Sequence, residues 1–140
     1  MNVEPTHQPD PRGGYVERLL AGPGVSLLLM SLVTLAALTV ARSGGDAGMF
    51  VLQAPLDEGL WQIPLSVFAH TGFAHLSANA LLLLVAGGIV VLSSSVVRYH
   101  AFFLVTGAFA GVAQVVVTGA FGDPVAVLGA SGAALAFVGY

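Results

Sequence analysis

Four polar side chains stand in or beside apolar stretches of the sequence and could carry chemistry: His70, His75, Asn79 and Ser131. An unpaired polar group in hydrocarbon costs several kcal/mol, so each of them needs a partner or a purpose. His75 and Asn79 are four residues apart, and a helix places them about 40° apart around its axis and one turn apart in depth. They can therefore present two neutral hydrogen-bond donors toward one point.

Ser131 lies among small residues, in the run Gly129-Ala130-Ser131-Gly132 at the predicted start of the last helix. Small neighbours leave the hydroxyl accessible and let another backbone approach closely. A hydroxyl at a helix N-terminus also has free N–H groups beside it, which suit an oxyanion. The run is not the Gly-x-Ser-x-Gly elbow of soluble hydrolases, because position 133 is Ala and no strand is predicted before it.

A purely structural interpretation stays open for these residues. Asn and His join neighbouring helices in many membrane bundles, and Ser can bond back to its own backbone. A metal site is disfavoured, because a continuous helix separates His70 from His75 by about 140° around its axis. No carboxylate stands nearby and the His-Glu-x-x-His pattern is absent. We therefore expect neither a metal nor a cofactor.

The composition indicates which solvent surrounds these residues. Hydrophobic residues make up 56% of the 140 residues, charged residues only 8%, and the mean hydropathy is +0.91. A soluble domain carries about a quarter charged residues, and a disordered chain has low hydrophobicity, so both classes are excluded. A net charge of -3 gives no electrostatic footprint for nucleic acid, and the absence of Cys excludes disulfides and thiolate metal sites. The partner that remains is the lipid bilayer.

The apolar runs predict four membrane-spanning helices, at residues 24–41, 75–92, 101–121 and 125–140. Residues 1–22 are predicted to form a polar, flexible tail, residues 42–72 a mixed loop partly in the membrane interface, and residues 98–100 an interfacial break. The last run reaches only about 24 Å against a hydrocarbon core of about 30 Å. We therefore expect a transmembrane domain over residues 23–140 that is truncated inside its fourth helix.

The arginines predict the orientation of these spans. Arg12 and Arg18 precede the first span and Arg98 follows the second, so the positive-inside rule places all three in the cytoplasm. Asp57 and Asp123 then face outward, in a protein expected in the cell membrane. The second and fourth spans both start at the outer face, which brings His75 and Ser131 to similar depths.

Residues 61–79, WQIPLSVFAHTGFAHLSAN, resemble the first loop and second helix of rhomboid intramembrane serine proteases. The His-x4-His-x3-Asn spacing is similar to that family's second-helix signature. The run Gly129-Ala130-Ser131-Gly132 resembles the family's Gly-x-Ser-Gly nucleophile motif. Gln62, Val91 and Leu135 depart from the family, which often has Arg, Glu and an aromatic residue at these places. The resemblance covers residues 61–140.

The resemblance implies an all-α integral membrane fold, a multi-spanning bundle of which four of an expected six transmembrane helices are present. It implies an endopeptidase that cleaves transmembrane protein substrates with a Ser–His dyad and no cofactor. Ser131 would be the nucleophile, and His75 and Asn79 would be oxyanion donors. His70, Gly129 and Gly132 would support the site.

The same resemblance implies that the dyad is incomplete in this sequence. The family's general base is a histidine on the sixth helix, which the 140 residues do not contain, so we expect this chain by itself to be inactive. The alternative is a catalytically inactive rhomboid-like protein that binds membrane clients. A transporter or channel is disfavoured, because no acid lies inside a predicted span. The sequence predicts no particular oligomeric state.

Overall fold

A computed structural model describes residues 11–56, 59–122 and 125–140 as an all-helical fold. Three helices are long and apolar enough to cross a membrane, at Gly14–Arg42, Phe73–Ser93 and Val96–Ala120. The first consists of α1 (Pro11–Leu19), the π-turn η1 (Leu20–Gly24) and α2 (Val25–Arg42), and the second of α4 (Phe73–Leu82), the π-turn η4 (Leu83–Gly87) and α5 (Gly88–Ser93). The third is α6 (Val96–Ala120). The chain is thus an integral membrane protein.

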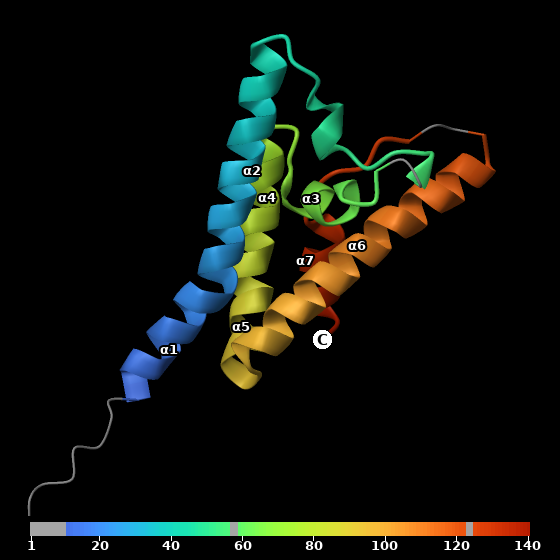
Figure 1. The fold of residues 1–140 in the computed structure, drawn as a ribbon. Coiled ribbons are helices and arrows are strands. Elements are labelled where there is room, and N and C mark those ends of the chain that lie inside the picture. Colours follow the sequence, from blue (N-terminus) through green and yellow to red (C-terminus); the bar gives the residue numbers. More distant parts are fainter. Residues whose placement is uncertain (1–10, 57–58, 123–124) are drawn as a thin grey trace, which may run out of the picture.

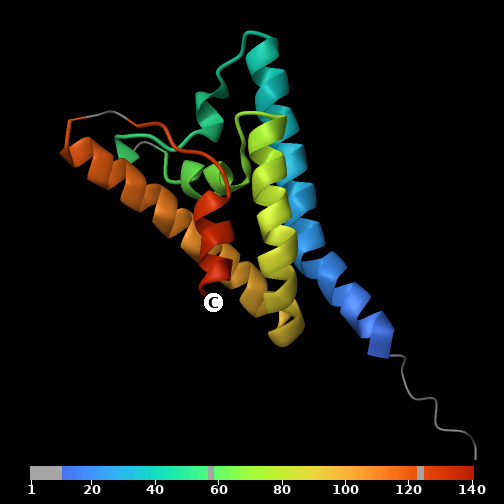
Figure 2. The same ribbon diagram turned by 180° about the vertical axis from the view of Figure 1, so that it is seen from behind.

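The two short helices α3 (Gln62–Phe68) and α7 (Ser131–Val138) lie between the long ones. Figures 1 and 2 show α2 beside α4, with α6 crossing obliquely and α7 between α6 and the α4–α5 helix. Small residues allow this close packing. A Cβ added to Gly107 of α6 would come within 2.7 Å of Val67 in α3 and 3.4 Å of Ala133 in α7. Gly107 therefore serves as a packing position, as small residues do in membrane bundles.

The first helix begins at Pro11, where the sequence predicts a flexible tail up to residue 22. Tertiary contacts explain the difference, because the Arg18 guanidinium donates to the carbonyls of Leu92 (3.3 Å) and Ser94 (3.2 Å) at the end of α5. Pro23 lacks an N–H and sits inside η1, where the Val25 amide donates to the carbonyls five and three residues before it. The tail prediction is corrected for residues 11–22, and residues 1–10 lie outside the described residues.

The turn between the second and third helices falls at Ser94, and the predicted break at residues 98–100 is wrong. Ser95 is the N-cap of α6, and its side chain accepts a hydrogen bond from the Arg98 amide at 3.2 Å. His100 therefore lies in the second turn of α6, and its Nε2 donates to the Ala21 carbonyl in η1 at 2.7 Å. This contact joins the start of α6 to the first helix.

The run at residues 125–140 is not a fourth spanning helix, because only Ser131–Val138 is helical. Val127 is extended and forms an isolated antiparallel bridge with Leu52, with N···O distances of 2.9 and 2.8 Å. Gly129 then adopts a φ of +116°, which an L side chain rarely takes and which ends the extended stretch. Backbone pairing with a distant loop therefore replaces the first part of the expected helix.

The mixed loop contains the 3-10 turn η2 (Ala47–Phe50) and α3, and it packs onto the membrane helices. Val67 of α3 is buried, while Trp61 at its start is half exposed. The core below is aromatic, since Tyr99 of α6 stacks on Phe137 of α7 with ring centroids 4.9 Å apart. These contacts fix α3 and α7 against α6, and the candidate site lies above them.

Candidate active site

The loop after α3 brings two histidines together. Helix α3 ends at Phe68, Ala69 is extended, and α4 begins at Phe73 after an extended Gly72. His70 and His75 are therefore not on one continuous helix, and their rings meet edge to face with centroids 4.9 Å apart. This corrects the 140° separation expected on a continuous helix. No third His, Asp or Glu joins the pair among the described residues.

His70 connects three parts of the chain and is only 2% exposed. Its Nδ1 lies 3.1 Å from the Phe68 carbonyl and 3.3 Å from the Thr34 hydroxyl, and its Nε2 accepts from the Ala130 amide at 3.3 Å. A carbonyl only accepts and an amide only donates, so these partners assign the proton to Nδ1 and the lone pair to Nε2. His70 is thus a neutral hydrogen-bonding residue in contact with the turn before Ser131.

Burial keeps His70 in this neutral form. Desolvation is the main cause that lowers the pKa of His70 to about 4, and the nearby His75 lowers it further. The hydrogen bond to the Phe68 carbonyl acts in the opposite direction. At neutral pH the ring therefore donates from one nitrogen and accepts at the other.

Gly129 lies directly against the two rings. A Cβ at this position would stand 2.8 Å from Cε1 and 2.9 Å from Nε2 of His75, and 3.6 Å from Cδ2 of His70. Its amide donates to the Ser66 carbonyl of α3 at 2.8 Å. Both the positive φ and the close contact require glycine here, so Gly129 allows the His75 ring to reach the turn before Ser131.

Ser131 is the first residue of α7, and Ala130 is its N-cap. The Ser131 side chain is exposed, and its hydroxyl makes no hydrogen bond with any described residue. The next residue, Gly132, packs onto α6, because an added Cβ would collide with the Cβ of Ala110. The nucleophile candidate therefore sits at an accessible helix start whose position is fixed by α6.

Asn79 is buried one turn below His75, and its side chain is bonded within its own helix. The Nδ2 of Asn79 donates to the His75 carbonyl at 3.1 Å, while Nδ1 of His75 lies 3.3 Å from the Thr71 hydroxyl. Within the described part of the chain, no hydrogen bond links Asn79 to Ser131. The structure thus brings His70, His75 and Gly129 together around the turn to Ser131, while the Asn79 side chain is bonded to its own helix.

Three contacts of this site were not predicted from the sequence: the Thr34 hydroxyl, the Ser66 carbonyl and the Ala130 amide. The first span carries four hydroxyl residues, Ser26, Ser31, Thr34 and Thr39, and nothing in its sequence singles out Thr34. The other two contacts use backbone atoms, which leave no trace in residue type. A tertiary structure is needed to find all three.

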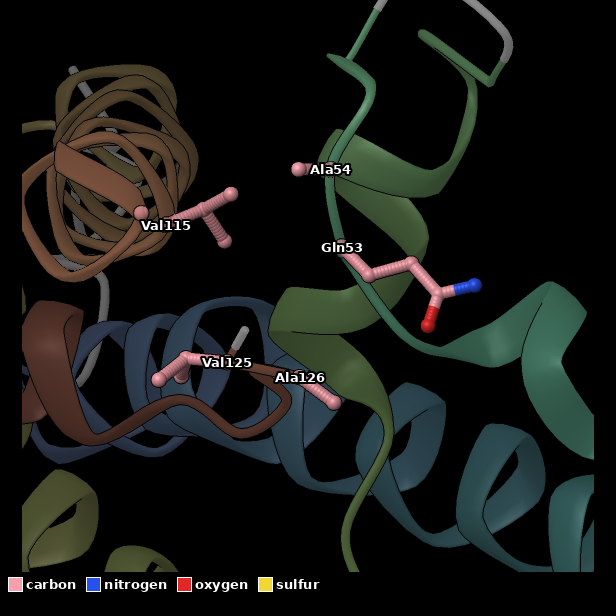
Figure 3. A pocket seen from close by; sticks show the side chains of 6 residues that line it. Gln53, Ala54, Val115, Val125 and Ala126 are labelled. Atoms are coloured by element: carbon pink, nitrogen blue, oxygen red, sulfur yellow. The ribbon is translucent and has the colours of Figure 1, made fainter. Parts of the chain in front are cut away.

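Two cavities of the described structure lie away from the histidine pair. Figure 3 shows a small one of about 140 Å³, lined by Val115 of α6, Ala54, Val125 and Ala126, with the Gln53 amide directed away from Val115. A larger apolar groove of about 610 Å³ runs between the α4–α5 helix and the end of α7. Neither of these two cavities is lined by His70, His75 or Ser131.

Comparison with known proteins gives one match. A family model described as Rhomboid domain matches residues 57–140, which is more than half of the chain. No curated protein and no solved structure matches significantly. The matched stretch contains the histidine pair, Asn79 and Ser131.

Proposed function

The chain belongs to the rhomboid family, and on that premise we propose that it carries the nucleophile and oxyanion donors of an intramembrane serine endopeptidase. Ser131 attacks a peptide carbonyl of a transmembrane substrate, and His75 and Asn79 donate to the developing oxyanion. One observation supports this assignment most. The His75 ring lies against Gly129, two residues before Ser131 at the start of α7.

The chemistry of this proposal needs two things around Ser131. The oxyanion needs donors in a water-poor site, and the amides at the start of α7 lie beside the hydroxyl to supply them together with His75 and Asn79. The hydroxyl also needs a base that takes its proton and returns it to the leaving amine.

None of the histidines that the structure describes is assigned as this base. Both ring nitrogens of His70 are engaged, and His75 serves the oxyanion. His100 bonds to Ala21 at the far end of the bundle, and His7 lies outside the described residues. We therefore propose that a further histidine completes the dyad and that these 140 residues alone are inactive.

A second candidate function is a catalytically inactive rhomboid relative that binds membrane clients. The hydrogen bond from Asn79 to the His75 carbonyl favours it, because an Asn bonded within its own helix can be purely structural. In that case His75 and Asn79 pack helices and Ser131 has no special reactivity.

Labelling with an active-site-directed fluorophosphonate separates these candidates. In the intact gene product, reconstituted in lipid, we expect labelling at Ser131 and cleavage of a transmembrane substrate, and Ser131→Ala should abolish both. Asn79→Ala should lower turnover by roughly 10- to 10³-fold, the scale for loss of one oxyanion donor. Ser77→Ala is the matched control, because among the described residues the Ser77 hydroxyl bonds only to its own helix at Phe73.

The opposite results would identify the alternative. A protein that is neither labelled nor active, but that still binds membrane proteins, is the inactive relative. Labelling of Ser131 in the 140-residue chain by itself would contradict the assignment of the base, and His70 would then be the first base to test.

A further inference from the structure

Thr34 of α2 contacts the His70 side of the site from the first membrane-spanning helix. It is only 3% exposed. Its hydroxyl lies 3.4 Å from the Phe68 carbonyl and 3.3 Å from Nδ1 of His70. On the opposite edge of the same ring, Nε2 accepts from the Ala130 amide, one residue before Ser131. One imidazole therefore spans from α2 to the N-cap of α7.

The proton positions along this path are determined by their partners. The Thr34 hydroxyl donates to the Phe68 carbonyl, so its oxygen can accept from Nδ1–H of His70. If Thr34 instead donated to Nδ1, the His70 proton would move to Nε2 and would face the Ala130 N–H. Thr34 and the Phe68 carbonyl thus favour the only neutral tautomer whose Nε2 can accept from Ala130.

We propose that Thr34 is a positioning residue for the nucleophile, acting through the His70 tautomer to fix the Ala130 amide and with it the turn that presents Ser131. This inference rests on the proposed function for its catalytic meaning. Thr34 touches neither Ser131 nor any reacting atom, and its effect passes through one ring and one backbone amide.

The hydrogen bonds from Thr34 through His70 to Ala130 also determine which amides remain available at the start of α7. The Ala130 N–H is committed to His70 and is directed into the protein. The amides of Ser131 and Gly132 follow it in the first turn, where a helix leaves its N–H groups without partners from its own backbone. Loss of the His70 contact would leave a buried donor unpaired, which disfavours the native turn.

The test compares three variants of the 140-residue chain in detergent micelles. Thr34→Val keeps the shape and removes the hydroxyl, and Thr34→Ser restores a hydroxyl. Thr39→Val is the matched control, because within the described part of the chain the Thr39 hydroxyl bonds only to its own helix at Leu35. Nitrogen-15 NMR of the histidine ring reports the tautomer of His70, and amide hydrogen exchange reports Ala130.

In the wild type we expect a protonated Nδ1 and an unprotonated Nε2 on His70. Thr34→Val removes one of the two acceptors near Nδ1–H, so it should loosen the ring and raise the other tautomer only in part, because the Phe68 carbonyl remains. It should accelerate exchange of the Ala130 amide by roughly 5- to 30-fold, the scale for one weakened buried hydrogen bond. Thr34→Ser should restore most of the protection, and Thr39→Val should change neither reading.

Two results would overturn the inference. The first is an Nε2-protonated His70 in the wild type, a measurement that does not depend on whether any variant folds. The second is a Thr34→Val protein with the wild-type tautomer and wild-type exchange at Ala130.

Catalysis is measured separately, so the positioning role of Thr34 and the protease function can fail independently. In the intact gene product, Thr34→Val should slow fluorophosphonate labelling of Ser131, and Thr34→Ser should recover it. Labelling at the wild-type rate in Thr34→Val would reject the positioning role and leave the protease proposal standing. No labelling in any variant, with the tautomer and exchange as expected, would reject the protease and leave the path from Thr34 to Ala130 intact.

Discussion

At the scale of single residues, the site depends on positions where only one residue type fits. Gly129 combines a φ of +116° with a contact that leaves no room for a side chain beside His75. His70 is buried, yet it satisfies both ring nitrogens in its neutral form. These two residues, rather than Ser131 itself, make the most specific contacts of the site.

Replacing Gly129 by Ala should therefore be costly. The new Cβ would sit at 2.8 Å from the His75 ring in a conformation that L residues rarely adopt. We expect the free energy of unfolding in mixed micelles to fall by about 1–3 kcal/mol, the range for such backbone strain. Gly119→Ala is the control, because nothing lies within 4 Å of its added Cβ. Equal stability of the two variants would contradict the strain at Gly129.

The neutrality of His70 predicts a loss of stability in acid. Its pKa of about 4 in the fold lies below the ordinary 6.5 of an unfolded chain. The unfolded chain therefore binds more protons between these values, and the free energy of unfolding should fall by up to about 3 kcal/mol as the pH drops from 7 to 4. Chemical unfolding across this range should show a weaker pH dependence in His70→Gln. An unchanged dependence would mean that other groups cause the acid sensitivity.

The sequence predicts part of this residue-scale picture and misses the rest for a physical reason. The spacing of His75 and Asn79 predicts a shared helix face, because helical geometry is local. The hydrogen bond between His70 and Ala130 joins residues on different elements. Its donor is a backbone N–H, which every residue except proline carries. Residue types alone cannot identify such a partner.

At the scale of elements, the ends of the helices are fixed by side chains from other helices. Arg18 of α1 donates to carbonyls at the end of α5, where a helix carries partial negative charge. His100 of α6 donates to Ala21 beside Pro23. Helix continuity from Pro11 therefore rests on tertiary contacts, which explains why the polar composition of residues 11–22 predicts a tail instead.

Removing the Arg18 contact should loosen α1 without unfolding the bundle. In Arg18→Met we expect amide exchange to become roughly 3- to 10-fold faster over residues 14–20, in line with the loss of partly exposed charged hydrogen bonds. Exchange in the middle of α6 should not change. Arg98→Met is the control, since Arg98 is also an exposed arginine, in the first turn of α6, and among the described residues it contacts Ser95 through its backbone amide and not through its side chain. Equal effects of both variants would argue against a specific role for Arg18.

The last apolar run shows what hydropathy alone cannot predict about an element. Residues 125–140 have the composition of a spanning helix, and hydropathy cannot distinguish a helix from an apolar extended segment. Val127 pairs with Leu52, a residue far away in the sequence, and Gly129 turns the chain into α7. The helix length was therefore wrong, although the predicted helix start near Ser131 agrees with α7.

At the scale of the whole molecule, the first helix is longer than the membrane is thick. Its 29 residues at Gly14–Arg42 span about 43 Å, against about 30 Å of hydrocarbon. At the usual tilt of about 20°, at least one end therefore projects beyond the apolar layer. The positive-inside rule predicts that the Arg18 end faces the cytoplasm, together with Arg98.

Single cysteines test this topology directly, because the native chain has none. An impermeant thiol reagent applied to intact cells should label Ser43→Cys, at the opposite end of the first helix, and should not label Arg98→Cys. Labelling after the cells are opened shows that both sites are reactive. The reversed pattern would invert the orientation and place the site at the cytoplasmic face.

The π-turn at Leu20–Gly24 gives the first helix a register that depends on one extra residue. A π-turn is an α-helix with a single insertion, so deleting one residue there would let the α-helical ladder close. Because the wider turn absorbs the extra residue, the helix before the deletion would keep nearly the same rotation about the axis. Arg18 would then still face the carbonyls of Leu92 and Ser94. A one-residue deletion within Leu20–Gly24 should thus be tolerated better than one in the regular helix α2, which would rotate everything before it by about 100° around the axis.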